Sequence, residues 1–127
     1  MATGIVVAVI VVFFIVVGIL NKRGVVIVNG ESAKKLIDKG NMKIIDVRTP
    51  EEFKGGHING ALLIPVSEIK NRINELASMK DSELLVYCHS GGRSSAASQI
   101  LRKQGFTKIH NLQGGIAAWR GMGYPLV

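Results

Sequence analysis

The sequence contains a single cysteine, Cys88, at a position where a thiol can become reactive. The apolar run before it predicts a buried strand, and a short loop with two glycines leads into a helical pattern. In open α/β sheets, ligands bind where a strand ends and a helix begins. Backbone N–H groups, the helix dipole and nearby Arg93 would lower the pKa of the thiol. A buried structural cysteine is the alternative, but the glycines and Arg93 favour a reactive thiolate.

The loop residues after Cys88 are candidates for holding a thiolate or a bound anion. The glycines let the backbone curl so that its amides face the sulfur, although an ordinary turn before a helix would use them as well. Arg93 would pair with an anionic donor, and the serines would donate hydrogen bonds or cap the helix. The predicted binding residues are His89, Ser90, Gly91, Gly92, Arg93 and Ser94.

Two further residues, Asp46 and Arg48, end a predicted strand and are expected to form a supporting charge pair near the same edge. His57 and Trp119 are expected to be structural. One cysteine excludes an internal disulfide and a cysteine-rich zinc site, so we expect neither a metal nor a cofactor.

The run Gly4–Leu20 is apolar throughout and predicts a membrane-spanning helix. It would be about 26 Å long at ~1.5 Å per residue, close to the ~30 Å apolar core of a bilayer. Lys22 and Arg23 follow the run, so the rest of the chain is expected to face the cytoplasm. We therefore predict a single-pass anchor over residues 1–23, with its span at about 4–20.

Three alternatives compete with this anchor. A buried core helix would need a larger domain to enclose it. A cleaved signal peptide would carry basic residues before the run, and none is present. A span extended to Val28 would place Lys22 and Arg23 inside the bilayer, at about 2.5–3.5 kcal/mol each near its centre.

All 16 Lys and Arg and all nine Asp and Glu follow the apolar run, and the formal net charge is +7. This charge suits an anionic lipid surface or a small anionic substrate. No basic patch interleaved with aromatic residues is evident, so nucleic acid is not an expected partner.

Strand and helix signals alternate after the apolar run, which predicts one domain over residues 24–127 with a parallel sheet covered by helices on both faces. Thr49 and Glu52 flank Pro50 in a pattern typical of a capping box. Ser67 is expected to cap a helix that turns Ile69, Ile73 and Leu76 inward. The other predicted strands are Val25–Val28, Lys43–Val47, Ala61–Ile64, Leu84–Tyr87 and Lys108–His110. The other predicted helices are Glu31–Lys39, Arg93–Gln104 and Gly115–Arg120. The helix Arg93–Gln104 is expected to carry an apolar face made of Ala96, Ala97, Ile100 and Leu101.

Three motifs in this order resemble the single-domain rhodanese-like family of sulfurtransferases. The motifs are Asp46-Val47-Arg48-Thr49-Pro50-Glu51-Glu52-Phe53 with Gly56-His57-Ile58-Asn59-Gly60-Ala61, then Tyr87-Cys88-His89-Ser90-Gly91-Gly92-Arg93-Ser94, then Asn111-Leu112-Gln113-Gly114-Gly115-Ile116-Ala117-Ala118-Trp119. The resemblance implies a five-stranded parallel sheet with Cys88 at the carboxyl end of a central strand. His89 departs from the family, which often has an arginine there, and this lowers the positive charge expected of the loop.

The resemblance also implies a reaction. The loop from Cys88 to Arg93 has the length of the family's sulfur-transferring members, whereas its phosphatase relatives have one residue more. Cys88 would take sulfur from a donor such as thiosulfate, form a persulfide, and pass the sulfur to cyanide or a thiol. The alternative is a membrane-tethered module that senses sulfide or redox state, or binds a partner, without significant turnover.

Overall fold

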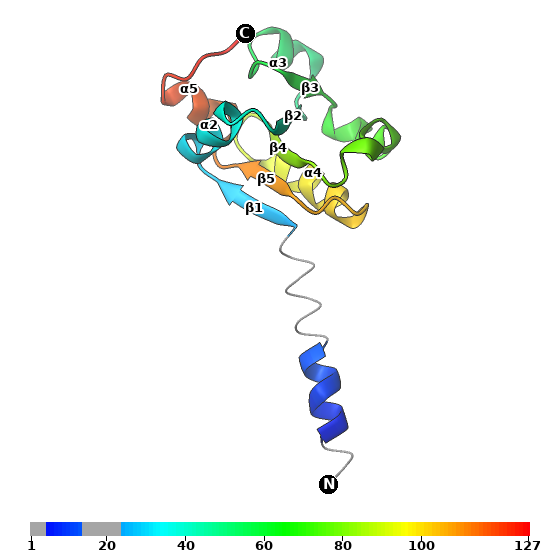
Figure 1. The fold of residues 1–127 in the computed structure, drawn as a ribbon. Helices are drawn as coiled ribbons and strands as arrows, with labels where there is room; N and C mark the ends of the chain where they lie inside the picture. Colours follow the sequence, from blue (N-terminus) through cyan, green and yellow to red (C-terminus); the bar gives the residue numbers. More distant parts are fainter. Residues whose placement is uncertain (1–4, 14–23) are drawn as a thin grey trace.

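A five-stranded parallel sheet forms the centre of the computed structural model, which describes residues 5–13 and 24–127 (Figure 1). Its strands lie in the order β1-β5-β4-β2-β3, so β4, which Cys88 follows, is central as expected. The strand bounds are β1 (Val25–Val28), β2 (Met42–Asp46), β3 (Ala61–Leu63), β4 (Glu83–Tyr87) and β5 (Ile109–Leu112). Because all neighbouring strands are parallel, their carboxyl ends share one edge, and Cys88 lies there.

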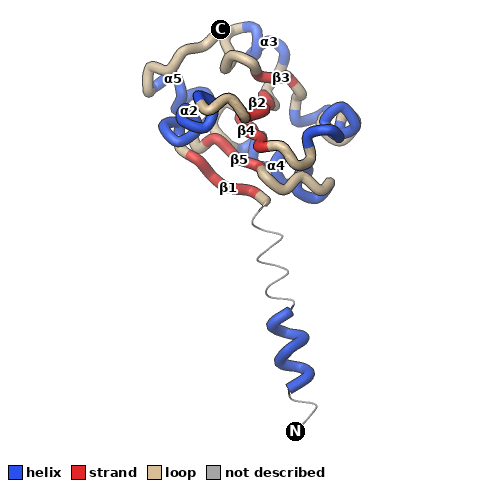
Figure 2. The backbone as a smooth tube through the Cα atoms, viewed as in Figure 1, coloured by secondary structure: helices blue, strands red, loops and turns tan. Residues whose placement is uncertain are grey.

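Helices cover both faces of the sheet, which confirms the predicted layers (Figures 1 and 2). Ala33 and Trp119 place α2 and α5 on one face, and Leu101 and Leu76 place α4 and η2 on the other. The bounds are α2 (Gly30–Asp38), α3 (Pro50–Lys54), η1 (Val66–Glu68), η2 (Ile73–Met79), α4 (Gly92–Lys103) and α5 (Gly115–Gly121).

The helix starts follow from local chemistry. The Asn29 side chain accepts a hydrogen bond from the Ser32 amide at 2.8 Å and caps α2. Thr49 and Glu52 form the predicted capping box, with Pro50 in the first turn of α3.

The segment after Pro65 differs from its prediction. Instead of one helix capped by Ser67, two short 3-10 helices form, and Ser67 lies inside η1, which has no side-chain cap. Ile69 and Leu76 are fully buried, as expected. The physical reason is that burial of these side chains, rather than a capped helical repeat, determines the path of this connection.

Two further corrections concern β5 and α4. The last strand runs to Leu112 rather than ending at His110, because Val86 and Val28 of the neighbouring strands pair with Asn111 and Leu112. On α4, Ala96 is exposed, and the buried face consists of Ser94, Ala97, Ser98 and Leu101. Small hydroxyl side chains therefore lie where the sequence predicted an apolar stripe.

Of the predicted membrane span, only residues 5–13 are described; they are helical, and their apolar side chains are exposed. The remainder of that span lies outside the described residues. Within residues 5–13 and 24–127, no helix combines the length and hydropathy that crossing a bilayer requires.

Candidate functional site

The Cys88 thiol lies between the end of β4 and the start of α4, where the sequence placed it. The residue is only 1% exposed and belongs to the apolar core beneath α4. Burial of this kind also fits a structural cysteine, so the hydrogen bonds to the sulfur decide what the thiol can do.

Those hydrogen bonds favour the thiolate. The Gly91 amide donates to Cys88 Sγ at 3.1 Å, and Ser94 Oγ lies 3.4 Å from the sulfur. Burial raises the pKa of the thiol, but hydrogen bonds from Ser94 and from the Gly91 and Ser90 amides outweigh it, so the pKa lies below its ordinary value. The amides of the loop and one hydroxyl therefore favour the thiolate form of Cys88.

The Ser94 hydroxyl can serve both protonation states of the thiol. It donates to the Gly91 carbonyl at 3.1 Å and accepts from the Cys88 thiol. When the thiol loses its proton, rotation of this hydroxyl turns its hydrogen toward the sulfur. Since Ser94 is fully buried, no water competes for that bond.

The start of α5 holds the loop from the other side, a role that the sequence did not indicate. The amides of Ile116 and Ala117 donate to the carbonyls of Cys88 and His89, at 2.9 and 3.1 Å. At Gly115, φ is +57°, and a Cβ would lie 2.5 Å from both carbonyl oxygens. With its carbonyls bound to α5, the loop can direct its amides toward the sulfur. The glycine pair in the third motif was the available signal.

The Arg93 side chain is engaged by Glu52, which the sequence suggested only as a helix cap. Its two terminal nitrogens donate to the two Glu52 carboxylate oxygens at 2.6 and 2.9 Å. The hydrogen bonds from Arg93 are the largest influence that lowers the pKa of Glu52 to about 2. Glu52 and Arg93 are 41 positions apart in the chain, so no local sequence pattern could have revealed the pair. The structure thus places a compensated arginine, rather than a free one, beside Cys88.

The predicted Asp46–Arg48 pair is present and buried, at the same edge of the sheet. The two side chains are 0% and 3% exposed, and Arg48 donates to both Asp46 oxygens and to the Gly56 carbonyl. Removing one partner of such a pair typically costs about 3–5 kcal/mol of stability, because the other charge stays buried. The pair holds the loop before β3 against the end of β2.

The remaining loop residues differ in exposure. His89, Ser90 and Gly92 are exposed, whereas Gly91 is half-buried with φ at +120°, a conformation that favours glycine. His57 stacks on Phe53, and its backbone pairs with Val127 at the carboxyl terminus, which matches the structural role expected of it.

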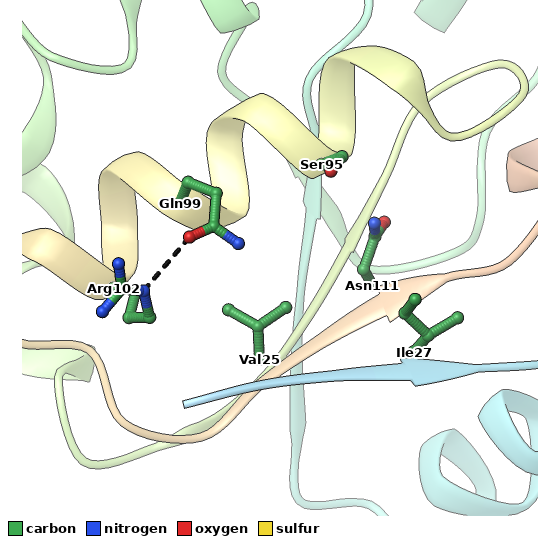
Figure 3. A pocket seen from close by; sticks show the side chains of 6 residues that line it. All are labelled: Val25, Ile27, Ser95, Gln99, Arg102 and Asn111. Carbon is green, nitrogen blue, oxygen red and sulfur yellow. Dashed lines mark hydrogen bonds between the residues drawn. The ribbon is translucent and has the colours of Figure 1, made fainter. Parts of the chain in front are cut away.

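A pocket of about 390 Å³ lies elsewhere, between α4 and the strands β5 and β1 (Figure 3). Ser95 and Gln99 of α4 face Asn111 across it, and Arg102 lies at the end nearest the start of β1 (Figure 3). Cys88 is not among its lining residues, so this pocket is separate from the thiol site.

Comparison with known proteins matches residues 29–122 to the model of the rhodanese-like domain. The uncharacterized protein YqhL of Bacillus subtilis is 49% identical over 79 residues, which are 62% of this chain and 61% of that protein. A sulfurtransferase of Allochromatium vinosum is 39% identical over 75% of this chain and 87% of its own length. The thiosulfate sulfurtransferase PspE of Escherichia coli is 40% identical over 55% of this chain and 67% of its own.

Among solved structures, the crystal structure of a rhodanese-related protein from Thermoplasma volcanium resembles the fold with a TM-score of 0.73. The two are 32% identical, and the match covers 80% of this chain and 97% of that one.

Proposed function

The chain belongs to the rhodanese-like family, and on that premise we propose that it is a sulfurtransferase that carries sulfane sulfur on Cys88. The proposed donor is a small sulfur anion such as thiosulfate, and the proposed acceptor is cyanide or a thiol. The similarity to PspE, a thiosulfate sulfurtransferase, supports this choice of donor. The reaction requires no cofactor or metal.

The observation that carries the proposal is the set of hydrogen bonds to one sulfur atom. The Gly91 amide and the Ser94 hydroxyl lie within reach of Cys88 Sγ and stabilise negative charge on it. The same donors can bind the outer sulfur of a persulfide, which is also an anion. His89 and Ser90 line the loop on its exposed side, where donor and acceptor would approach.

The reaction balances in two steps. The Cys88 thiolate attacks the outer sulfur of thiosulfate, an S–S bond forms, and the original S–S bond breaks as sulfite leaves with the electron pair. The acceptor then attacks the outer sulfur of Cys88–S–S⁻, takes that sulfur, and regenerates the thiolate. Cyanide would leave as thiocyanate, and the kinetics would be of the ping-pong type.

Mass spectrometry of the intact protein tests the first step. Thiosulfate treatment should add the mass of one sulfur atom to Cys88, and cyanide should remove it. Cys88→Ser should acquire no sulfur, because a hydroxyl is a poor nucleophile near neutral pH. An unmodified Cys88 in a folded protein would refute the thiosulfate donor. A stable adduct that no acceptor removes would favour the sensing or partner-binding module.

The proposal includes an anchor over residues 1–23, with the rhodanese-like domain over 24–127 facing the cytoplasm. The support is the apolar run of residues 4–20, the exposed apolar helix over residues 5–13, and the cations Lys22 and Arg23 that follow. Such an anchor would confine sulfur transfer to a membrane surface without taking part in the chemistry.

A further inference from the structure

Exposed cations gather at the end of the sheet opposite Cys88. Because the strands are parallel, the residues that precede each strand share this end with the last turns of the helices that lead into them. We call it the basic end, and its cationic residues are the half-buried Arg102 and five exposed lysines, Lys39, Lys43, Lys80, Lys103 and Lys108.

Backbone contacts place Lys80 and Lys108 of the basic end close together. The Thr107 amide donates to the Lys80 carbonyl at 3.4 Å, and the Leu84 amide donates to the Lys108 carbonyl at 2.9 Å. A Cβ at Gly105 would lie 4.0 Å from Lys80 Nζ. The connection from α4 to β5 therefore lies beside the start of β4, and Lys80 and Lys108 lie at the same end of the sheet.

The five lysines of the basic end carry largely uncompensated charge. All five are exposed, and in the part of the chain that the structure describes none of them forms an ion pair. The nearby carboxylates are few, and two of them have other partners: Asp38 binds Lys34 at 2.8 Å, and Glu83 contacts His110 at 2.6 Å. Asp81 is the third.

The chain also enters the sheet at the basic end. The Gly24 carbonyl accepts a hydrogen bond from the Ile109 amide at 2.9 Å, and Lys22 and Arg23 precede Gly24 in the sequence. The apolar run of residues 4–20 comes just before them. Clusters of lysine and arginine next to such a segment are attracted to anionic lipid headgroups.

We infer that the basic end is a surface that binds an anionic phospholipid bilayer. An RNA partner fits less well, because single-stranded bases need aromatic side chains to stack on, and Phe106, which lies beside this end, is only 1% exposed. Since Cys88 lies at the opposite edge of the sheet, a domain bound in this way would present its thiol to the aqueous phase. The inference is independent of the sulfur chemistry.

Lysine footprinting of the full-length protein tests this inference. Vesicles of phosphatidylcholine alone would be compared with vesicles that also contain phosphatidylglycerol, and an amine-reactive reagent would report each lysine by mass spectrometry. Labelling of Lys80, Lys103 and Lys108 should fall about threefold or more on the anionic vesicles. Lys54, exposed at the end of α3, which follows β2 at the carboxyl edge of the sheet, should be unchanged. About 1 M salt should abolish the difference.

Charge-reversal variants sharpen the test. Lys103→Glu combined with Lys108→Glu should abolish the lipid-dependent protection of Lys80, whereas Lys54→Glu should retain it. Equal labelling on both kinds of vesicle, or equal protection of Lys54, would overturn the inference, and so would protection by an RNA oligonucleotide on zwitterionic vesicles. If the double variant does not fold, the footprint of the unmodified protein decides alone. The footprint does not depend on sulfur transfer, so an inactive thiol would not be mistaken for a failure of lipid binding.

Discussion

At the scale of single residues, the properties of Cys88 depend on the donors around its sulfur more than on nearby positive charge. Arg93, the cation nearest in the loop sequence, is paired with Glu52. The hydrogen bonds that lower the thiol pKa come instead from Ser94 and from the loop amides. Single substitutions can separate these two influences.

Ser94→Ala should raise the pKa of Cys88, because it removes a hydrogen bond to the thiolate while burial remains. The thiolate is the deprotonated form, so the rate of alkylation rises as pH passes the thiol pKa. The profile of the unmodified protein should have its midpoint below the free-cysteine value of about 8.5, and that of Ser94→Ala should lie at higher pH. Ser95→Ala, at the exposed neighbouring position, should leave the profile in place. A midpoint at or above 8.5 in the unmodified protein would show that the loop does not activate Cys88.

Glu52→Gln should improve the use of thiosulfate, because it leaves the charge of Arg93 uncompensated beside Cys88. Glutamine can still close the capping box with Thr49, so α3 should remain intact. The pair is partly exposed, so we expect the KM for thiosulfate to fall by a modest factor, about two- to fivefold at low salt. Glu51→Gln, one position earlier and exposed, is the matched control. Steady-state kinetics with thiosulfate would measure the effect, and an unchanged KM would contradict it.

At the scale of elements, the loop after β4 is held between two helices. The loop leads directly into α4, and backbone amides in the first turn of α5 donate hydrogen bonds to two of the loop's carbonyls. The close approach depends on Gly115, where no side chain separates α5 from the loop.

Gly115→Ala should impair both folding and sulfur transfer. Its Cβ would collide with the carbonyls of Cys88 and His89, and its positive φ would be strained, at a cost of about 1–3 kcal/mol. Urea unfolding and the sulfur-transfer assay should both register the change. Gly121→Ala, in the same helix with open space around its Cβ, should be close to neutral. Unaltered stability and activity in Gly115→Ala would mean that this contact does not shape the loop.

At the scale of the whole molecule, the two ends of the sheet have different roles in our proposals. The carboxyl edge holds the thiol, and the amino edge holds the exposed lysines and receives the chain at Gly24. A membrane at the amino edge would leave the thiol at the carboxyl edge accessible.

The proposed topology predicts that the domain resists protease added to sealed, right-side-out spheroplasts. Lys22 and Arg23 favour the cytoplasmic side, so the domain should be cleaved only after the membrane is permeabilised. Immunoblotting with an antibody against the domain would follow the cleavage, and a periplasmic protein would serve as the positive control. Digestion in intact spheroplasts would place the domain outside.

Much of the fold and the position of the thiol could be predicted from the sequence alone. The capping box of Thr49 and Glu52, the alternation of strands and helices, and the place of Cys88 between β4 and α4 are encoded in residues that are neighbours in the chain. Local hydrogen bonds and the periodic spacing of apolar side chains produce these features, and both can be seen in a short window of sequence.

Only the tertiary structure decided how the site is completed. Glu52 reaches Arg93 because α3 and α4 both begin at the carboxyl edge of the sheet, and Gly115 meets Cys88 because β5 and β4 are adjacent. The 3-10 connection after Pro65 likewise follows the burial of Ile69 and Leu76 against distant residues. Such contacts depend on the order of strands in the sheet, which brings together residues whose separation in the chain carries no pattern.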